Sequence, residues 1–342
     1  MQASTITKWD LGEQWAARQT AHPESSFRDD ARALGVSEAE LVATECGSSV
    51  TRLCGGWVEL LRGLQELGPV SLQTEANGAL IDARGIAVTA GWSGRRGVLR
   101  VGASRLRVQL DRWDHGFAAR GAREQESLQF FDGDGDRILT VGRLPETMSE
   151  RWTQLVRRFT SADQRPWAHT GARSTAAPLS PAAVDAKAFR RAWDGLRGAG
   201  DFADMLQRFG LSRCQALRLV GEPRARQVPT STLRLALRCA ANAMVPLSLA
   251  VDAPGVSQNY TGLVRRVEIA GELLVVVEAG VRLYANELRL ATAWLVRRPS
   301  EHGTLSSLQY FDAADQLILT VAGNTTPGEP GLKRWERLVA SL

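Results

Sequence analysis

The sequence contains few of the residues that most often bind metal ions or act as nucleophiles. Only four cysteines and four histidines occur among its 342 residues. The cysteine spacings match neither a zinc knuckle nor a redox pair, so we interpret the cysteines as reduced thiols. The histidines stand in no pattern typical of a catalytic triad or a metal site; they are His22, His115, His169 and His302. The sequence therefore argues against a metal site built from several histidines.

Long apolar segments are missing as well. No segment reaches the roughly 18 uninterrupted apolar residues of a membrane span, and Met1–Trp15 holds no apolar run typical of a secretory signal. We therefore expect a cytoplasmic protein without a membrane span. Lysine is scarce, since only Lys8, Lys187 and Lys333 occur among the 42 lysine and arginine residues. The net charge of +5 is mildly basic and far from that of a polycationic nucleic-acid-binding tail.

What the sequence does contain is an internal repeat. The segment SLQFFD at Ser127–Asp132 recurs as SLQYFD at Ser307–Asp312, and ILTV at Ile138–Val141 recurs at Ile318–Val321 with the same offset. A repeat this long is typical of two globular halves rather than of a solenoid. We predict a first repeat over residues 1–160 and a second over residues 186–342. Residues 161–185, which are rich in Ala, Pro, Ser and Thr, are predicted to be the linker between them.

Local signals predict helices followed by strands in each half. Gly35 is expected to end one helix, and a capping box at Ser37 to start the next. Gly210 and Ser212 repeat this arrangement in the second half. Each half is expected to close with an amphipathic helix, at Met148–Phe159 and Gly331–Leu342.

Runs rich in apolar and β-branched residues predict the strands, at Leu80–Ala90, Val98–Leu110, Ser127–Phe131, Pro246–Val251, Leu263–Ile269, Leu273–Glu278 and Thr292–Val296. Short turns rather than crossover helices join these segments. The expected fold class is therefore α+β, a tandem structural repeat in which each half is a large, mostly antiparallel β-sheet flanked by helices.

Two further motifs resemble known binding sites. The acidic run Asp132–Asp136 resembles the start of a calcium-binding loop but lacks the later Gly and Glu that such a loop needs, so a hairpin turn is favoured. Residues Ala31–Leu41 resemble a helix-turn-helix, but Glu38 and Glu40 on its second helix would repel phosphates. The second copy is more basic, so DNA binding stays open as an alternative function.

Several segments together resemble one protein family. A resemblance to the bacterial hemin-degrading factors, which are HemS/HmuS-type haemin transport proteins, is carried by Gly35–Leu41, Ser127–Asp132, Phe209–Leu219, Thr261–Arg266 and Ala293–Pro299. It runs in order through both repeats. It implies a cytoplasmic protein of iron acquisition that binds haem or a related tetrapyrrole in a cleft, and transfers it or opens its ring. A haem importer or a haem oxygenase is the protein partner that it implies.

The resemblance also assigns individual residues. A haem site needs an axial ligand for iron, arginines for the propionates and an apolar wall for the porphyrin. Arg107 matches a family arginine that reaches haem, whereas Gln109 replaces a family aromatic residue. Gly200 stands at the position of the family's axial histidine, and glycine offers no side-chain donor. The resemblance thus implies a haem site without its usual iron ligand, which leaves haem-degrading activity open.

Further candidates lie at or near positions where the family usually has a histidine and this sequence has another residue. Tyr260 and Tyr284 occupy two such positions, and a tyrosinate can ligate ferric haem; alternatively, both tyrosines pack on half-buried strands. Arg265 and Arg266 are candidate partners for propionates. The main hypothesis is a haem-utilisation protein with an atypical iron site. The first alternative is a non-enzymatic binding or regulatory scaffold that has lost haem coordination, and the second is a DNA-binding protein.

Overall fold

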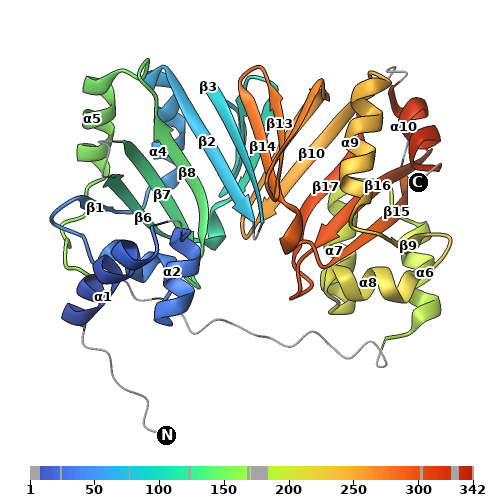
Figure 1. Cartoon of the computed structure of the whole chain (residues 1–342), viewed down its shortest axis with the longest axis horizontal. Helices are drawn as coiled ribbons and strands as arrows, with labels where there is room; N and C mark the ends of the chain where they lie inside the picture. Colours follow the sequence, from blue (N-terminus) through green and yellow to red (C-terminus); the bar gives the residue numbers. More distant parts are fainter. Residues whose placement is uncertain are drawn as a thin grey trace, which may run out of the picture.

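Two antiparallel wings of β-sheet stand side by side at the centre of the molecule, and helices cover their outer ends (Figure 1). The structure is a computed structural model, and it describes residues 8–23, 25–76, 78–121, 125–167, 170, 184–300, 303–324 and 331–340. His169 and His302, together with most of the predicted linker, lie outside these residues. Among the described helices, none is both long and apolar enough to cross a membrane.

The helices occur in the same order in the two halves. Those of the first half are α1 (Lys8–Ala21), α2 (Phe27–Leu34), α3 (Glu38–Ala43), α4 (Trp57–Gly63) and α5 (Ser149–Phe159). Those of the second half are α6 (Ala186–Asp194), α7 (Ala199–Phe209), α8 (Arg213–Val220), α9 (Thr232–Asn242) and α10 (Gly331–Ala340). Short 3-10 helices are η1 (Leu64–Leu67), η2 (Leu110–Arg112) and η4 (Glu287–Arg289).

The strands form two wings that share the long strand β3. The first-half strands are β1 (Val50–Leu53), β2 (Pro69–Ala76), β3 (Ala79–Ser93), β4 (Arg96–Val101), β5 (Ser104–Gln109), β6 (Trp113–Arg120), β7 (Glu126–Asp132) and β8 (Arg137–Arg143). The second-half strands are β9 (Ala225–Val228), β10 (Pro246–Ala253), β11 (Val256–Leu263), β12 (Arg266–Ala270), β13 (Leu273–Glu278), β14 (Val281–Asn286), β15 (Thr292–Ser300), β16 (Gly303–Phe311) and β17 (Leu317–Gly323).

Each wing contains strands from both halves of the chain. The first wing runs β1-β6-β7-β8-β2-β3-β14-β13-β12, because β14 of the second half pairs with β3. The second wing runs β9-β15-β16-β17-β10-β11-β5-β4-β3, because β5 of the first half pairs with β11. The two halves are therefore interlocked by exchanged strands.

One hydrophobic core extends through both halves. It takes in buried residues of both wings and of α4, α5, α9 and α10. A buried polar contact crosses it as well, because the side-chain N–H of Gln258 lies 3.2 Å from both the carbonyl of Leu72 and the hydroxyl of Ser104. Separate, smaller clusters pack α1–α3 in the first half and α6–α8 in the second.

The structure confirms the predicted α+β tandem fold and its helix caps. Gly35 and Gly210 end helices in the left-handed conformation, at φ +70° and +62°. Ser37 and Ser212 each form the capping box. Local sequence determines these features, since a cap involves residues only three positions apart.

Two turns lie within segments for which the sequence makes a prediction. The single strand predicted over Val98–Leu110 is in fact the hairpin β4–β5, because Gly102 adopts φ +55° between them. The acidic run is a hairpin turn, as predicted. The carboxylate of Asp132 accepts the backbone N–H groups of Asp134 and Asp136, at 3.1 and 2.9 Å.

Candidate functional site

A row of side chains crosses the face of the second wing that points away from the main core. Strand register places its members opposite one another on β16, β17, β10, β11, β5 and β4; they are Gln309, Thr320, Ala250, Asn259, Arg105 and Arg100. Neighbouring strands lie about 4.8 Å apart, so the row spans roughly 24 Å. Small residues in its middle leave a flat floor, and arginines occupy one end.

The arginine end contains the predicted residue Arg107. It lies on β5 two residues beyond Arg105, on the same face and opposite Ser257 of β11. Burial, together with the charges of Arg107 and Arg100, lowers the pKa of Arg105. The charged groups that act on Arg105 are thus all positive. An anion bound here would relieve this repulsion.

A second group of cations lies beside the helix layer of the same face. The guanidinium groups of Arg213 on α8 and Arg298 on β15 stand 5.0 and 5.9 Å from the ring centroid of Phe202 on α7. Burial lowers the pKa of both arginines. For Arg213 the charge of Arg298 lowers the pKa further, and the nearby carboxylate of Asp252 on β10 partly offsets this.

Asp252 connects the two groups of arginines. It lies opposite Ser257, which in turn lies opposite Arg107 on the next strand. The arginines of β5 and those beside α7 therefore belong to one face. Cationic groups flank a flat, largely uncharged floor, which suits a planar ligand with acidic side groups.

Gly200 is the second residue of α7. The carboxylate of Asp201 accepts the backbone N–H groups of Arg197 and Gly198, at 2.9 and 2.7 Å, and these bonds lower the pKa of Asp201. Residues Ala203 and Gln207, three and seven positions after Gly200, are exposed, whereas Phe202 is buried. Helical periodicity therefore places position 200 on the open side of α7.

Tyr260 lies on the opposite side of β11 from the arginine face. Its side chain is buried in the main core, and its hydroxyl donates to the carbonyl of Leu263 at 2.7 Å. Burial, with the nearby carboxylate of Glu278, raises the pKa of Tyr260 to about 12. A buried, hydrogen-bonded hydroxyl with this pKa is a poor source of tyrosinate.

The remaining predicted residues are divided between the two wings. Gln109 is exposed on the same face of β5 as Arg107. Tyr284 lies in the first wing, on β14, opposite Leu80. Arg265 forms an ion pair with Glu278 at 3.0 Å, and Arg266 pairs with Glu268, both beyond the end of β11. The structure thus brings Arg107 and Gln109 together and places Tyr260, Tyr284 and this arginine pair elsewhere.

Several residues of this face were missed by the sequence analysis. Arg105 could have been found, because it alternates with Arg107 along one strand. Arg213, Arg298 and Gln309 come together only through helix packing and strand pairing, which no local pattern reveals. The side-chain N–H of Gln309 lies 3.3 Å from the Ser307 hydroxyl, while its buried carbonyl oxygen has no hydrogen-bond partner among the described residues.

The described residues contain no cluster of three or more His, Cys, Asp or Glu side chains that could hold a metal ion. The histidines within the described ranges are His22, after α1, and His115 on β6, both in the first half. Helix α7, beside this face, contains no histidine.

Fold and site define a duplicated α+β protein with a flat, arginine-edged sheet face beside a helix pair. The chain belongs to the family described as Haemin-degrading HemS.ChuX domain, which matches residues 35–159 and 210–342. The hemin transport protein HmuS of Yersinia pestis is 29% identical over 338 residues, which cover 97% of each chain.

Solved structures agree with this assignment. The crystal structure of apo-PhuS, a heme-binding protein from Pseudomonas aeruginosa, matches with a TM-score of 0.91 and 30% identity over 98% of this chain and 99% of PhuS. The crystal structure of ChuS, an E. coli heme oxygenase, matches with a TM-score of 0.85 and 25% identity over 97% and 99% of the two chains.

Proposed function

We propose that this chain is a haem-utilisation protein that binds haem on the second-wing face. The observation that carries this proposal is the arginine end of the flat row, where Arg100, Arg105 and Arg107 meet on adjacent strands. Arginine binds carboxylates with paired, charge-assisted hydrogen bonds. Two propionates at this end would leave the porphyrin plane over the small residues of the floor.

The proposed role of the helix layer is to cover the porphyrin rather than to bind its iron. Phe202 and the guanidinium groups of Arg213 and Arg298 lie together beside the floor. Gly200 has no donor atom at the position where the family carries its axial histidine. Weak iron coordination favours holding and passing on haem over opening its ring, because ring opening depends on ligands that control oxygen at the iron.

The compartment and the partner proteins that we propose follow from this role. The protein would receive haem in the cytoplasm from an importer and deliver it to an acceptor such as a haem oxygenase. The family assignment supports haem as the ligand, as does the similarity to the hemin transport protein HmuS and the heme-binding protein PhuS. Pull-down with a candidate partner, in the presence and absence of hemin, tests each proposed donor or acceptor protein.

A hemin titration followed by absorption spectroscopy tests the proposal. We expect a Soret shift with the wild-type protein, and an affinity at least tenfold lower when both Arg105 and Arg107 are replaced by Ala, since each charge-assisted bond contributes about 1.5–3 kcal/mol. Arg282→Ala is the matched control, because Arg282 lies on β14 of the first wing. A folded wild-type protein that gives no Soret shift at micromolar hemin would support the scaffold alternative instead.

A further inference from the structure

The first wing has a large cavity on the face that corresponds to the candidate haem face of the second. Its volume is about 830 Å³, within the range of roughly 300–1,000 Å³ that is typical of small-molecule pockets. Gln129 and Thr140 contribute to its polar floor, and Trp15, Phe27 and Val42 to its apolar wall. We call it the first-wing cavity.

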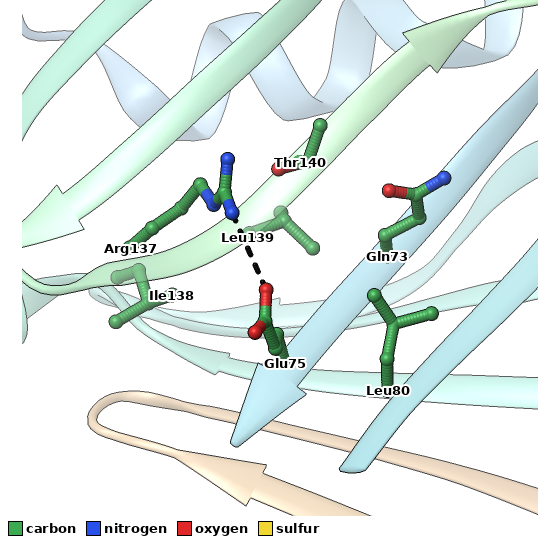
Figure 2. A pocket seen from close by; sticks show the side chains of 7 residues that line it. All are labelled: Gln73, Glu75, Leu80, Arg137, Ile138, Leu139 and Thr140. Carbon is green, nitrogen blue, oxygen red and sulfur yellow. Dashed lines mark hydrogen bonds and ion pairs between the residues drawn. The ribbon is translucent and has the colours of Figure 1, made fainter. Parts of the chain in front are cut away.

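A smaller cavity of about 100 Å³ adjoins it. Figure 2 shows this space between β2 and β8, with Gln73 on one side and Arg137 on the other. Gln73, Arg137 and Thr140 line both cavities. The guanidinium of Arg137 reaches the carboxylate of Glu75 at 3.3 Å across the smaller space. The two cavities together extend along the sheet face.

Three residues that line the first-wing cavity carry buried polar atoms without a hydrogen-bond partner among the described residues. These atoms are the indole Nε1 of Trp15, the Nε of Arg143 and the carbonyl Oε1 of Gln129. Leaving such atoms unpaired is unfavourable, and native proteins avoid it outside functional sites. Two are donors and one is an acceptor. Side-chain rotation would present them to a ligand with two acceptors and one donor.

The charges along the cavity favour an anionic ligand. Arg143 and Arg120 both pair with a single carboxylate, that of Glu126, at 2.8 and 3.8 Å. Arg120 is largely exposed. Two guanidinium groups therefore share one acid, and the second positive charge is left to bind a carboxylate from solution.

Among the residues that the structure describes, the lining of this cavity contains no histidine, cysteine, methionine or tyrosine, which are the protein ligands of haem iron. Its glutamates are already engaged, Glu126 by arginines and Glu45 by the hydroxyl of Ser49. A ligand bound here would therefore be held by its organic groups alone.

The repeat supplies an internal comparison. Gln129 and Gln309 are equivalent residues, and their side-chain N–H groups lie 3.2 and 3.3 Å from the hydroxyls of Ser127 and Ser307. Both carbonyl oxygens are buried and unpartnered within the described residues. The polar floor is thus retained in both wings, while the charged and aromatic surroundings differ.

We propose that the first-wing cavity binds a metal-free organic acid that has a conjugated body, at least one carboxylate and an N–H donor. A tetrapyrrole without iron has all of these groups. Its carboxylate would lie against Arg120 and Arg143, its N–H against Gln129, and its conjugated body against Trp15 and Phe27. Only the choice of a tetrapyrrole rests on the proposed function; the cavity and its charges do not.

Protoporphyrin IX is the probe, and binding is followed by its fluorescence and by quenching of tryptophan. The titration uses the Arg105→Ala, Arg107→Ala protein, in which the second-wing face is weakened. We expect one remaining site, whose affinity falls about tenfold with Gln129→Leu added and further with Arg143→Met. Gln309→Leu in the same background is the matched control and is expected to leave this site unchanged. Trp15→Phe keeps an aromatic ring but removes the indole N–H together with the five-membered ring, so it gives a milder test.

Either of two results would overturn the proposal. One is a double-arginine variant that is folded by circular dichroism but binds no protoporphyrin. The other is residual binding that Gln309→Leu weakens and that Gln129→Leu and Trp15→Phe leave intact. Failure of the proposed function is recognised separately, as wild-type protein that does not bind hemin. Protoporphyrin bound in the first wing without hemin bound in the second would support this inference alone.

Discussion

Arg107 and Tyr284 occupy the same position in the two repeats. Each is the fourth residue of a strand that crosses to the other half, where Arg107 lies opposite Ser257 and Tyr284 opposite Leu80. The repeat therefore places an arginine on the second-wing face and a tyrosine on the first-wing face. The two residues belong to two different surfaces, although both were candidates for one haem site.

This relationship predicts opposite outcomes for two alanine substitutions. Arg107→Ala is expected to weaken hemin binding about tenfold through loss of a charge-assisted bond. Tyr284→Ala is expected to leave both the affinity and the Soret band unchanged, because Tyr284 is in the other wing. Absorption titrations of the two variants check this. A changed ferric spectrum with Tyr284→Ala would instead identify Tyr284 as an iron ligand.

A histidine at position 200 should create an iron ligand. Gly200→His is expected to tighten hemin binding at least tenfold and to shift the spectrum toward a histidine-ligated form, because the imidazole would occupy the open side of α7. Gln154→His, at an exposed position of α5 in the first half, controls for adventitious histidine binding. If the two variants behave alike, position 200 does not face the haem iron.

The turn residue Asp132 should make stability depend on pH. Burial raises the pKa of Asp132 to about 6 in the folded protein, against about 3.9 in an unfolded chain. Because the folded protein holds the proton of Asp132 more tightly than the unfolded chain, protonation of Asp132 stabilises the folded protein. This contribution to the free energy of unfolding is fully present below pH 3.9 and is lost as the pH rises through 6. The expected loss is on the order of 3 kcal/mol.

Asp132→Asn isolates this effect. The amide oxygen can still accept the N–H groups of Asp134 and Asp136, but the side chain no longer ionises. Relative to wild type, the variant is expected to gain stability between pH 4 and pH 7. Urea unfolding of both proteins at several pH values measures the difference. A constant difference across this range would show that Asp132 ionises normally.

Two glycines of the sheet should respond very differently to alanine. A Cβ at Gly116 would lie 2.6 Å from the ring of Trp57, which is buried in the core, whereas a Cβ at Gly91 would meet nothing within 4 Å. Gly116→Ala is expected to cost about 1–3 kcal/mol of unfolding free energy through overpacking. Gly91→Ala is expected to change it by less than about 0.5 kcal/mol. Thermal or urea unfolding checks both values, and equal effects would contradict the packing argument.

Local features of this fold could be predicted from the sequence, and non-local ones could not. The capping boxes at Ser37 and Ser212 involve residues three positions apart, so the sequence contains the whole interaction. The hairpin turn at Asp132 was predictable for the same reason. The break at Gly102 was missed, because apolar alternation continues on both sides of it.

The candidate site shows the same division. The family resemblance assigns Arg107 and Gly200 as single positions in the sequence. It does not identify the neighbours of Arg107, because Ser257 and Asp252 come close to Arg107 only through strand pairing between the two halves. Tyr260 was a reasonable candidate by position, but strand alternation turns its hydroxyl toward the core.

The exchanged strands also affect how the chain folds as it is synthesised. Residues 104–108 of β5 pair with residues 256–260, and residues 79–83 of β3 pair with residues 281–285. The first half therefore emerges from the ribosome with two strand edges that stay unpaired until much of the second half has been made. Such distant pairings slow folding, and open edges invite aggregation. Arg105 and Arg107 lie on one of these edges, where their charges would discourage pairing between nascent chains.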